Sequence, residues 1–271
     1  MDVEAVAREL SVARKDGSVL TPPSRRHPSF SLKDGYAVGR LLHQERLASG
    51  AEPVGLKLGF TNKAAWTEFG LDSPFWAPIY DTTVNHKTGV SLSGLVAPRI
   101  EPEIVLGFRA DLHPNASPAE ISAAIGWAAV GFEIVQCHYP NWEMTPPDAV
   151  ADAGLHGVLV VGDHTEVHPP DGEELVNVEV ELRRGELLVA IGRGANALGG
   201  PVQAVAWLLR LPGVEGIQAG DVVTTGSLTT ALPVASGESW QLDTAGPVAL
   251  HQLRVRLSGA RLDSGLSGPS R

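Results

Sequence analysis

Hydrophobic positions near the start of the chain recur three and four residues apart, which is the spacing of one face of an α-helix. Residues 3–14 and 31–49 both show this spacing, and the second stretch begins with Ser31 and Asp34 in the arrangement of a capping box. A proline-rich connector, TPPSRRHPSF, lies between the two stretches. The pattern therefore predicts an N-terminal segment of two helices joined by a loop.

From residue 53 onward the pattern changes to short apolar runs of strand length, and frequent glycines and prolines mark the turns between them. The expected strands cover residues 54–58, 100–107, 130–135, 158–161, 176–183, 186–191, 221–225 and 250–257. Two helices are expected at residues 118–126 and 201–211. Many strands with few intervening helices predict an α+β fold rather than alternating βαβ units.

These patterns divide the chain into three parts. We expect a helical segment at residues 1–52 and a strand-rich domain at residues 53–257. The last stretch, residues 258–271, is small and polar, and we expect it to be a flexible tail. A chain of 271 residues is long enough for one large domain with a helical segment attached to it.

Composition and charge narrow the classes of function. The chain carries 21 Lys and Arg against 31 Asp and Glu, a net charge of −10, which argues against a nucleic-acid or anionic membrane surface. No apolar run approaches the length of about 18 residues that a membrane span needs. The acidic N-terminus lacks the layout of a signal peptide, and the single cysteine excludes internal disulfides. We therefore expect a cytoplasmic protein with a small-molecule partner.

Two Glu-x-Glu pairs differ in their surroundings. In NVEVELRRGE, Glu179 and Glu181 alternate with apolar residues, which is typical of a solvated strand face. In RIEPEIVLGF, Glu101 and Glu103 share a face with Val105 while the opposite face is apolar, so both faces look covered. Buried carboxylates about 6–7 Å apart along a strand repel each other, and they need a cation or a shared proton.

A third acid lies in an apolar strand. Glu133 stands inside AAVGFEIVQ, and with Glu101 and Glu103 it forms a set without Cys or His that suits Mg²⁺ or Mn²⁺. The alternative is that Glu133 pairs with a buried Lys or Arg and that the Glu-x-Glu pair merely edges a sheet. Lys57, between two leucines, is a candidate general acid/base or carboxylate holder with a pKa lowered by desolvation. A lysine extending from a strand end is the alternative interpretation.

Further polar residues are candidates for substrate contact. His138 and His156 have side chains suited to proton transfer, and a structural role for each stays equally open. Ser227 and Thr229 follow a predicted strand and offer hydroxyl groups to a carboxylate, although the segment also fits a plain turn. Cys137 is better explained as a small buried residue than as a nucleophile, because no triad pattern surrounds it.

Several segments occur in a collinear order that resembles a known family. They are VGLKLGFTNKAAWTEFG, RIEPEIVLGF, GFEIVQCHYPNW with DAVADAG, and GGPVQAVAWL followed by QAGDVVTTGSLTTALPVASGE. Over roughly residues 30–257 the chain resembles the hydratase/decarboxylase branch of the fumarylacetoacetate-hydrolase superfamily. The resemblance implies a mixed β-roll or β-sandwich core with an N-terminal helical portion, a divalent ion such as Mg²⁺ or Mn²⁺, and a homo-oligomer.

The resemblance also implies roles for individual residues. By position the metal-binding glutamates of the family correspond to Glu101, Glu103 and Glu133. Lys57 falls on the family's G-[YL]-K-[IML]-G lysine, and Asp81 falls near an acid that follows the family's lid region, so both are expected to be catalytic. Asp152 matches the aspartate of the family's A-D-N segment and is expected to bind substrate.

The departures from the family pattern bear on the substrate. Where relatives read Asp-Ser-Arg and then Asn-Ala-Ser, this chain presents His138 in the first segment and Ala153, Gly154 and Leu155, followed by His156, in the second. If these positions line the pocket, the far end of the substrate is apolar, because a second carboxylate would lack partners there. This interpretation favours hydration over decarboxylation.

Four functions follow from the residues and the resemblance. The first is a Mg²⁺-dependent hydratase of a 2-hydroxy-2,4-dienoate that gives a 4-hydroxy-2-oxo acid, as in meta-cleavage degradation of aromatic compounds. The second is a decarboxylase of a 2-oxo-3-enedioate on the same scaffold. The third is hydrolysis of a C–C bond in an acylpyruvate-like substrate, which needs a water-activating pair. The fourth is a non-enzymatic binding protein, which the three glutamates and the lysine argue against.

Overall fold

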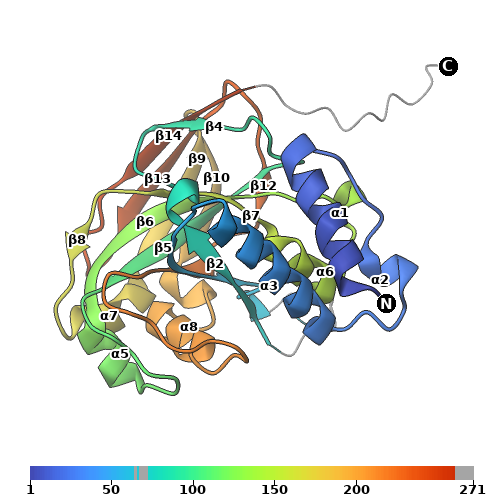
Figure 1. The fold of residues 1–271 in the computed structure, drawn as a ribbon. Coiled ribbons are helices and arrows are strands. Elements are labelled where there is room, and N and C mark those ends of the chain that lie inside the picture. The colour runs from blue at the N-terminus through green and yellow to red at the C-terminus, as the bar shows by residue number, and fades with distance from the viewer. Residues whose placement is uncertain (64–65, 67–72, 260–271) are drawn as a thin grey trace.

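The computed structural model describes residues 1–63, 66 and 73–259 (Figure 1). Three helices form the N-terminal segment: α1 (Val3–Asp16), α2 (Pro23–Arg26) and α3 (Leu32–Ala48). The capping box of Ser31 and Asp34 is present at the start of α3, as its sequence predicts. The predicted connector holds α2, a short helix that begins with a proline, where the missing N–H has no helical partner to lose.

The larger sheet has nine strands and carries the residues of interest. Its order is β2-β1-β11-β5-β6-β7-β3, with β12 paired to β5 and β8 paired to β6. The strands are β1 (Pro53–Gly59), β2 (Phe75–Tyr80), β3 (Val84–Asn85), β5 (Arg99–Phe108), β6 (Ile125–Val135), β7 (His156–Val161), β8 (Thr165–Glu166), β11 (Val222–Ser227) and β12 (Leu232–Pro233). The pairs β1–β11 and β3–β7 are parallel and the others are antiparallel, so the sheet is mixed.

A second sheet of five strands packs against the larger one, in the order β10-β9-β13-β14-β4. Its strands are β4 (Gly89–Ser91), β9 (Glu179–Arg184), β10 (Leu187–Arg193), β13 (Ser239–Ala245) and β14 (Leu253–Ser258). Side chains from β5, such as Ile104, share one buried cluster with Leu182 of β9 and Trp240 of β13. The alternation predicted for β9 is confirmed, since Val180 and Leu182 are buried while Glu179 and Glu181, which alternate with them, are partly exposed.

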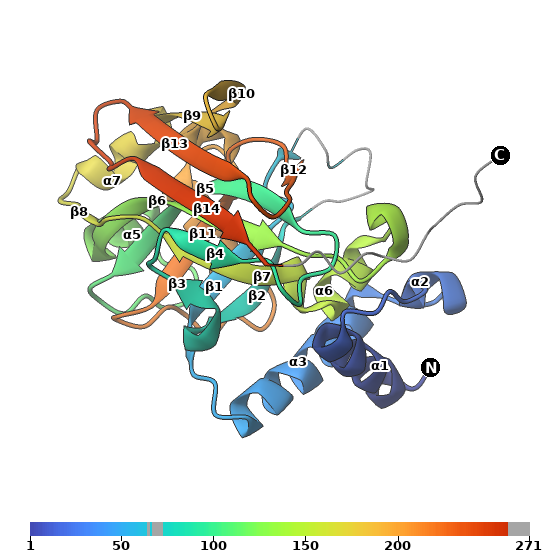
Figure 2. The same ribbon diagram turned by 90° about the horizontal axis from the view of Figure 1, so that it is seen from above.

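The remaining helices cover the edges of this core. They are α5 (Pro118–Ala124), α6 (Pro146–Ala151), α7 (Asp171–Glu174) and α8 (Pro201–Leu208), with short 3-10 turns η2 (Asp81–Thr83), η3 (Pro140–Trp142), η4 (Ala153–Leu155), η5 (Leu175–Asn177) and η6 (Gly194–Asn196). Helix α3 packs against α1 and α6. Figure 2 shows the N-terminal helices on the side of the larger sheet that lies away from β13 and β14.

Most predicted elements are present, with shifted ends. The helix expected at 118–126 ends at Ala124, and β6 starts at once and extends to Val135. The strand expected from residue 176 begins only at Glu179, after η5. Among the described residues the pattern missed the helices α2, α6 and α7 and six strands, namely β2, β3, β4, β8, β12 and β13. The flexible tail was expected at 258–271; residues 260–271 lie outside the described residues, while Ser258 still belongs to β14. Within the described ranges, no helix combines the length and apolar character that crossing a membrane would need.

Candidate metal centre

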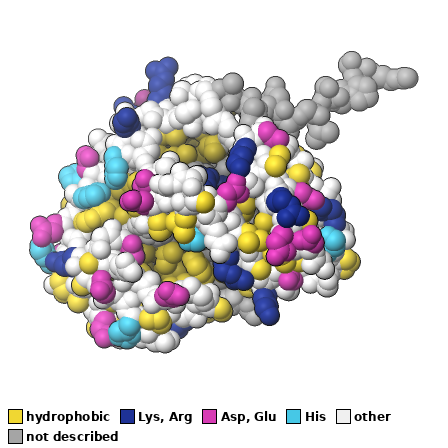
Figure 3. All heavy atoms as spheres, viewed as in Figure 1, with side chains coloured by type: hydrophobic (Ala, Val, Ile, Leu, Met, Phe, Trp, Pro, Cys, Tyr) yellow, Lys and Arg dark blue, Asp and Glu magenta, His cyan; other side chains and the backbone are white. Residues whose placement is uncertain are grey.

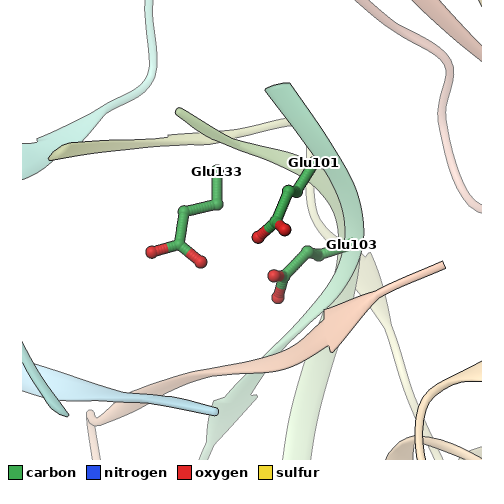
Figure 4. Close-up of side chains that lie close together, drawn as sticks. All are labelled: Glu101, Glu103 and Glu133. Atoms are coloured by element: carbon green, nitrogen blue, oxygen red, sulfur yellow. The ribbon is translucent and has the colours of Figure 1, made fainter. Parts of the chain in front are cut away.

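Three glutamates meet on one face of the β5–β6 pair. In this antiparallel register Glu101 lies opposite Glu133, and Glu103 follows two positions along β5, so strand alternation points all three side chains the same way. One oxygen from each carboxylate lies within 4.8 Å of the others. Figure 4 shows the three carboxylates turned toward a common point. Glu103 and Glu133 are fully buried and Glu101 is partly exposed.

Two of these carboxylates are held through one oxygen only. Glu103 Oε2 accepts a hydrogen bond from the Gly226 N–H at 2.9 Å. Glu133 Oε1 accepts from Lys57 Nζ at 2.9 Å and from His156 Nδ1 at 2.8 Å. The other oxygens, Glu103 Oε1 and Glu133 Oε2, are buried and have no hydrogen-bond partner among the described residues. Buried carboxylate oxygens without partners are costly, so this arrangement fits an oxygen-preferring cation.

The electrostatics point in the same direction. Burial raises the pKa of Glu101 to about 7 and raises the pKa of Glu103 well above its ordinary value. Burial would also raise the pKa of Glu133, but Lys57 and the hydrogen bond from His156 outweigh it and lower that pKa to about 2. With all three acids ionised and Lys57 protonated, the cluster carries a charge of −2, which one divalent cation would balance.

Lys57 lies at the centre of β1, between β11 and β2, and its side chain is 3% exposed. We expected a pKa lowered by desolvation, and this is wrong. Burial alone would lower the pKa of Lys57, but the carboxylates of Glu133, Glu101 and Glu103 raise it above its ordinary value. In the metal-free chain these carboxylates therefore favour the protonated ammonium form of Lys57. The alternative interpretation, a pairing of Glu133 with a buried lysine, is also present, and it coexists with the three-glutamate cluster.

The C-terminal end of β11 and the turn that follows it are shaped around Glu103. Gly226 has a φ of +101°, and a Cβ at this position would lie 2.0 Å from Thr61 Oγ1, so only glycine fits. Its N–H donates to Glu103. The hydroxyl groups of Ser227 and Thr229 bond to carbonyl oxygens within the same turn. Their expected contact with substrate stays a prediction.

His156 links the cluster to η2. Its Nδ1 bonds to Glu133, its Nε2 lies 2.9 Å from Thr83 Oγ1, and the side chain is buried. Burial lowers the pKa of His156. Sequence reasoning missed Thr83, because an isolated threonine 73 residues away carries no pattern that links it to His156.

Two expected site residues form a separate group. Asp152 is fully buried, and its carboxylate accepts hydrogen bonds from Arg14 at 2.8 Å and from His138 Nδ1 at 2.9 Å. Arg14 belongs to α1, so these bonds hold the helical segment against the strand-rich domain. The described contacts of His138 and Asp152 do not include the three glutamates. Their catalytic and substrate-binding roles gain no support from these contacts.

Three further positions lie away from the cluster. Asp81 is exposed, and its carboxylate accepts the Glu52 N–H at 2.9 Å, so the structure does not bring it to the glutamates. Leu155 is buried in the core beneath the N-terminal helices, and Ala153 packs against that core. The argument for an apolar substrate end assumed that these two positions line the substrate pocket. Ala153 borders a groove beside α3 and β2, whereas Leu155 is not among the residues that line it, so the apolar end stays a prediction.

The chain belongs to the fumarylacetoacetate hydrolase family: residues 51–255 match the family described as "Fumarylacetoacetate (FAA) hydrolase C-terminal". It is 30% identical to a 2-hydroxyhexa-2,4-dienoate hydratase of Comamonas testosteroni over 90% of this chain and 94% of that protein. It is 32% identical to a 2-keto-4-pentenoate hydratase of Dechloromonas aromatica over 91% of this chain and 95% of that protein.

A solved structure shares both the fold and the length of the chain. It is the 4-oxalocrotonate decarboxylase from Pseudomonas putida G7 complexed with magnesium and adipate, with a TM-score of 0.87 and 28% identity. The match covers 94% of this chain and 97% of that one. These comparisons confirm the predicted α+β fold and the resemblance to the hydratase/decarboxylase branch.

Proposed function

We propose that this chain is a lyase, a metal-dependent hydratase that adds water to a 2-hydroxy-2,4-dienoate and yields a 4-hydroxy-2-oxo acid. One observation carries the proposal: Glu103 and Glu133 each keep a buried oxygen that has no partner in the described part of the chain, within a cluster of three carboxylates. The curated hydratases named above support the reaction type, since each is matched over nine-tenths of this chain.

The donor set supports a divalent cation at Glu101, Glu103 and Glu133. Three carboxylates without nitrogen or sulfur ligands suit Mg²⁺ or Mn²⁺. When bound there, such a cation supplies Lewis-acid stabilisation of the negative charge that develops on the 2-oxygen of a chelated 2-oxo acid. Magnesium in the related decarboxylase structure supports the same choice.

Lys57 is proposed to act on the substrate as an acid rather than as a base. Its raised pKa keeps it protonated, and Glu133 uses one of its three N–H donors. The remaining donors can hold the substrate carboxylate or deliver a proton to the dienoate. Gly154 packs beside the lysine stem and against β2: a Cβ at this position would meet Lys57 Cδ at an ordinary contact distance of 3.7 Å but would clash with Ala77 Cβ at 2.6 Å.

Decarboxylation of a 2-oxo-3-enedioate is the second candidate. The observation in its favour is the close match in fold to a decarboxylase structure that holds adipate, a six-carbon dicarboxylate. Both reactions place negative charge on the same 2-oxygen, so one cluster of acids and one lysine serve either. The two reactions differ at the far end of the substrate: the 2-oxo-3-enedioate has a second carboxylate there, which needs a cationic or N–H partner in the protein, and the 2-hydroxy-2,4-dienoate does not.

C–C bond hydrolysis gains no support from the site. It needs a base that can take a proton from water, and His156 is the histidine that contacts the cluster. Both of its ring nitrogens are engaged, one by Glu133 and the other by Thr83. A purely non-enzymatic role is disfavoured because the cluster retains three acids and a buried lysine.

A substrate panel with product identification tests the proposal. We expect Mg²⁺-dependent conversion of 2-hydroxypenta-2,4-dienoate to 4-hydroxy-2-oxopentanoate, and loss of turnover in EDTA. Release of CO₂ from 2-oxo-3-hexenedioate with a kcat/KM preference of about tenfold or more would replace hydration by decarboxylation. The homo-oligomer and the cytoplasmic location stay predictions, and sedimentation of the purified protein tests the first of them.

A further inference from the structure

We propose that His156 is a positioning residue that fixes which oxygen of Glu133 faces the cation. The inference rests on the proposed metal centre and adds a specific device to it. His156 does not act on the substrate in this account. It holds Glu133 Oε1, and in doing so it leaves Oε2 for the ion.

The need for such a device follows from the rotation of a carboxylate. The terminal torsion of a glutamate is broad and roughly two-fold, so either oxygen of Glu133 can face the cluster. Lys57 alone cannot select one of them, because its ammonium is a mobile charge on a flexible stem. The planar ring of His156 offers a donor in a fixed direction, 2.8 Å from Glu133 Oε1.

The imidazole ring of His156 has a fixed orientation because its second nitrogen is also hydrogen-bonded. Nε2 lies 2.9 Å from Thr83 Oγ1, and the same hydroxyl lies 2.9 Å from the Tyr80 carbonyl oxygen. The backbone is fixed too, since the His156 carbonyl accepts a hydrogen bond from Arg14 at 2.7 Å. Outer hydrogen bonds of this kind orient metal ligands and tune the affinity for the ion.

His156 also separates the glutamate cluster from a neighbouring groove. A groove of about 1060 Å³ runs between α1 and α3 on one side and β1, β2 and residues 211–218 on the other. Thr83 and His156 border this groove, whereas the three glutamates do not. Figure 3 shows this face hollowed between α3 and α8, with hydrophobic side chains on the floor. A smaller residue at 156 would give water from the groove access to Glu133 Oε1.

Three substitutions separate positioning from simple packing. His156→Asn places an amide N–H where Nδ1 stood, so it can still donate to Glu133. His156→Gln places its amide near the former Nε2, where it reaches Thr83 and not Glu133. His156→Ala removes both contacts. The matched control is His43→Asn, because His43 borders the same groove and bonds to the Tyr80 hydroxyl instead of to the cluster.

The readout is Mg²⁺ affinity without substrate, measured by calorimetry on the metal-free full chain. We expect His156→Ala and His156→Gln to weaken binding by about 10- to 100-fold, the range for outer hydrogen-bond partners of metal ligands. His156→Asn and His43→Asn should stay close to the wild type. Thermal melting checks that each variant is folded, and the Asn and Gln variants carry the comparison if the Ala variant is not.

The possible failures are distinguishable. If the wild type binds no Mg²⁺, the metal centre and the proposed function fall. If the wild type binds Mg²⁺ and His156→Gln binds it equally well, the metal centre stands and the positioning role is overturned. Equal weakening by the Asn and Gln variants would also overturn it, because packing alone would then explain the loss.

Discussion

Two buried groups in this chain each combine an acid, a histidine and a cationic side chain, and they differ in how fully the acid is hydrogen-bonded. In the first, Asp152 meets His138 and Arg14, and both of its carboxylate oxygens accept hydrogen bonds. In the second, Glu133 meets His156 and Lys57, and one oxygen has no partner among the described residues. In the Asp152 group the acid is fully hydrogen-bonded, and the group joins the N-terminal helices to the rest of the fold. In the Glu133 group one carboxylate oxygen is still able to bind a ligand.

Charge separates the two groups in the same way. Asp152 and Arg14 compensate each other, and the hydrogen bonds from His138 and the charge of Arg14 outweigh burial and lower the pKa of Asp152. The glutamate cluster has three acids for one lysine, and burial leaves the pKa of Glu101 at about 7. A buried group that does not balance its own charge calls for a counter-ion.

The largest expected effect comes from removing a ligand charge. Glu133→Gln should lower Mg²⁺ affinity by more than about 100-fold, since a ligand should matter more than its outer partners do. Activity at limiting Mg²⁺ should fall with it. Glu179→Gln, on a solvated strand face, is the control and should change neither quantity. Equal losses of Mg²⁺ affinity in the two variants would contradict the assignment of Glu133 as a ligand.

Removing the lysine should separate chemistry from metal binding. Lys57→Met keeps the stem length and all three carboxylates, so we expect a folded protein that still binds Mg²⁺. Its kcat should fall by roughly 100-fold or more, the usual scale for a positioned acid. Steady-state kinetics at saturating Mg²⁺ measures this loss, and an active, folded variant would return Lys57 to a structural role.

Substitution in the group around Asp152 should change stability instead of Mg²⁺ affinity. Asp152→Ala leaves Arg14, whose side chain is 11% exposed, without the carboxylate that balances its charge, although its hydrogen bond to the His156 carbonyl remains possible. Breaking a buried ion pair by removing one partner costs about 3–5 kcal/mol in the free energy of unfolding. Urea unfolding measures that loss, while calorimetry on the folded variant should find Mg²⁺ affinity unchanged. A large loss of affinity would make Asp152 part of the metal centre.

The smallest expected effect is a dependence of folding stability on pH, which arises from the glutamate cluster when no metal is bound. The folded chain holds a proton on Glu101 up to about pH 7, whereas the unfolded chain releases it near 4.5. Folding therefore binds protons in this window, and stability falls as pH rises through it. Burial lowers the pKa of His43, His156 and His164, and these groups raise stability with pH over part of the same window. We therefore compare the metal-free protein with the metal-free Glu101→Gln variant, which keeps these histidines. Relative to that variant, the melting temperature should decrease from pH 5 toward pH 8, and added Mg²⁺ should remove the decrease. A relative rise with pH in the absence of metal would contradict the assignment.

The metal cluster was within reach of sequence reasoning because strand periodicity is local. Glu101 and Glu103 stand two residues apart on β5, and Glu133 interrupts an apolar strand, so alternation alone puts them on buried faces. The exact pairing of Glu101 with Glu133 needed the β5–β6 register, which sequence patterns do not give.

The contacts that surround the glutamate cluster could not be predicted from the sequence. Thr83 and Arg14 contact residues 73 and 138 positions away along the chain, and neither carries a local signal. The direction of the shift in the Lys57 pKa depends on three acids that only the fold assembles. Strand β2 escaped prediction because Pro78 interrupts it, although at the edge of the sheet a proline costs no ladder bond.

The central claim is that Glu101, Glu103 and Glu133 hold a divalent cation while Asp152 does not take part. Electron paramagnetic resonance measures free Mn²⁺ during titration of the metal-free protein, and the amount of bound Mn²⁺ follows by difference from the total. The account predicts one Mn²⁺ per chain for the wild type and for folded Asp152→Ala, and none at the same concentrations for Glu133→Gln. A wild type that binds no Mn²⁺, or a Glu133→Gln variant that binds it as tightly as the wild type, would contradict the claim.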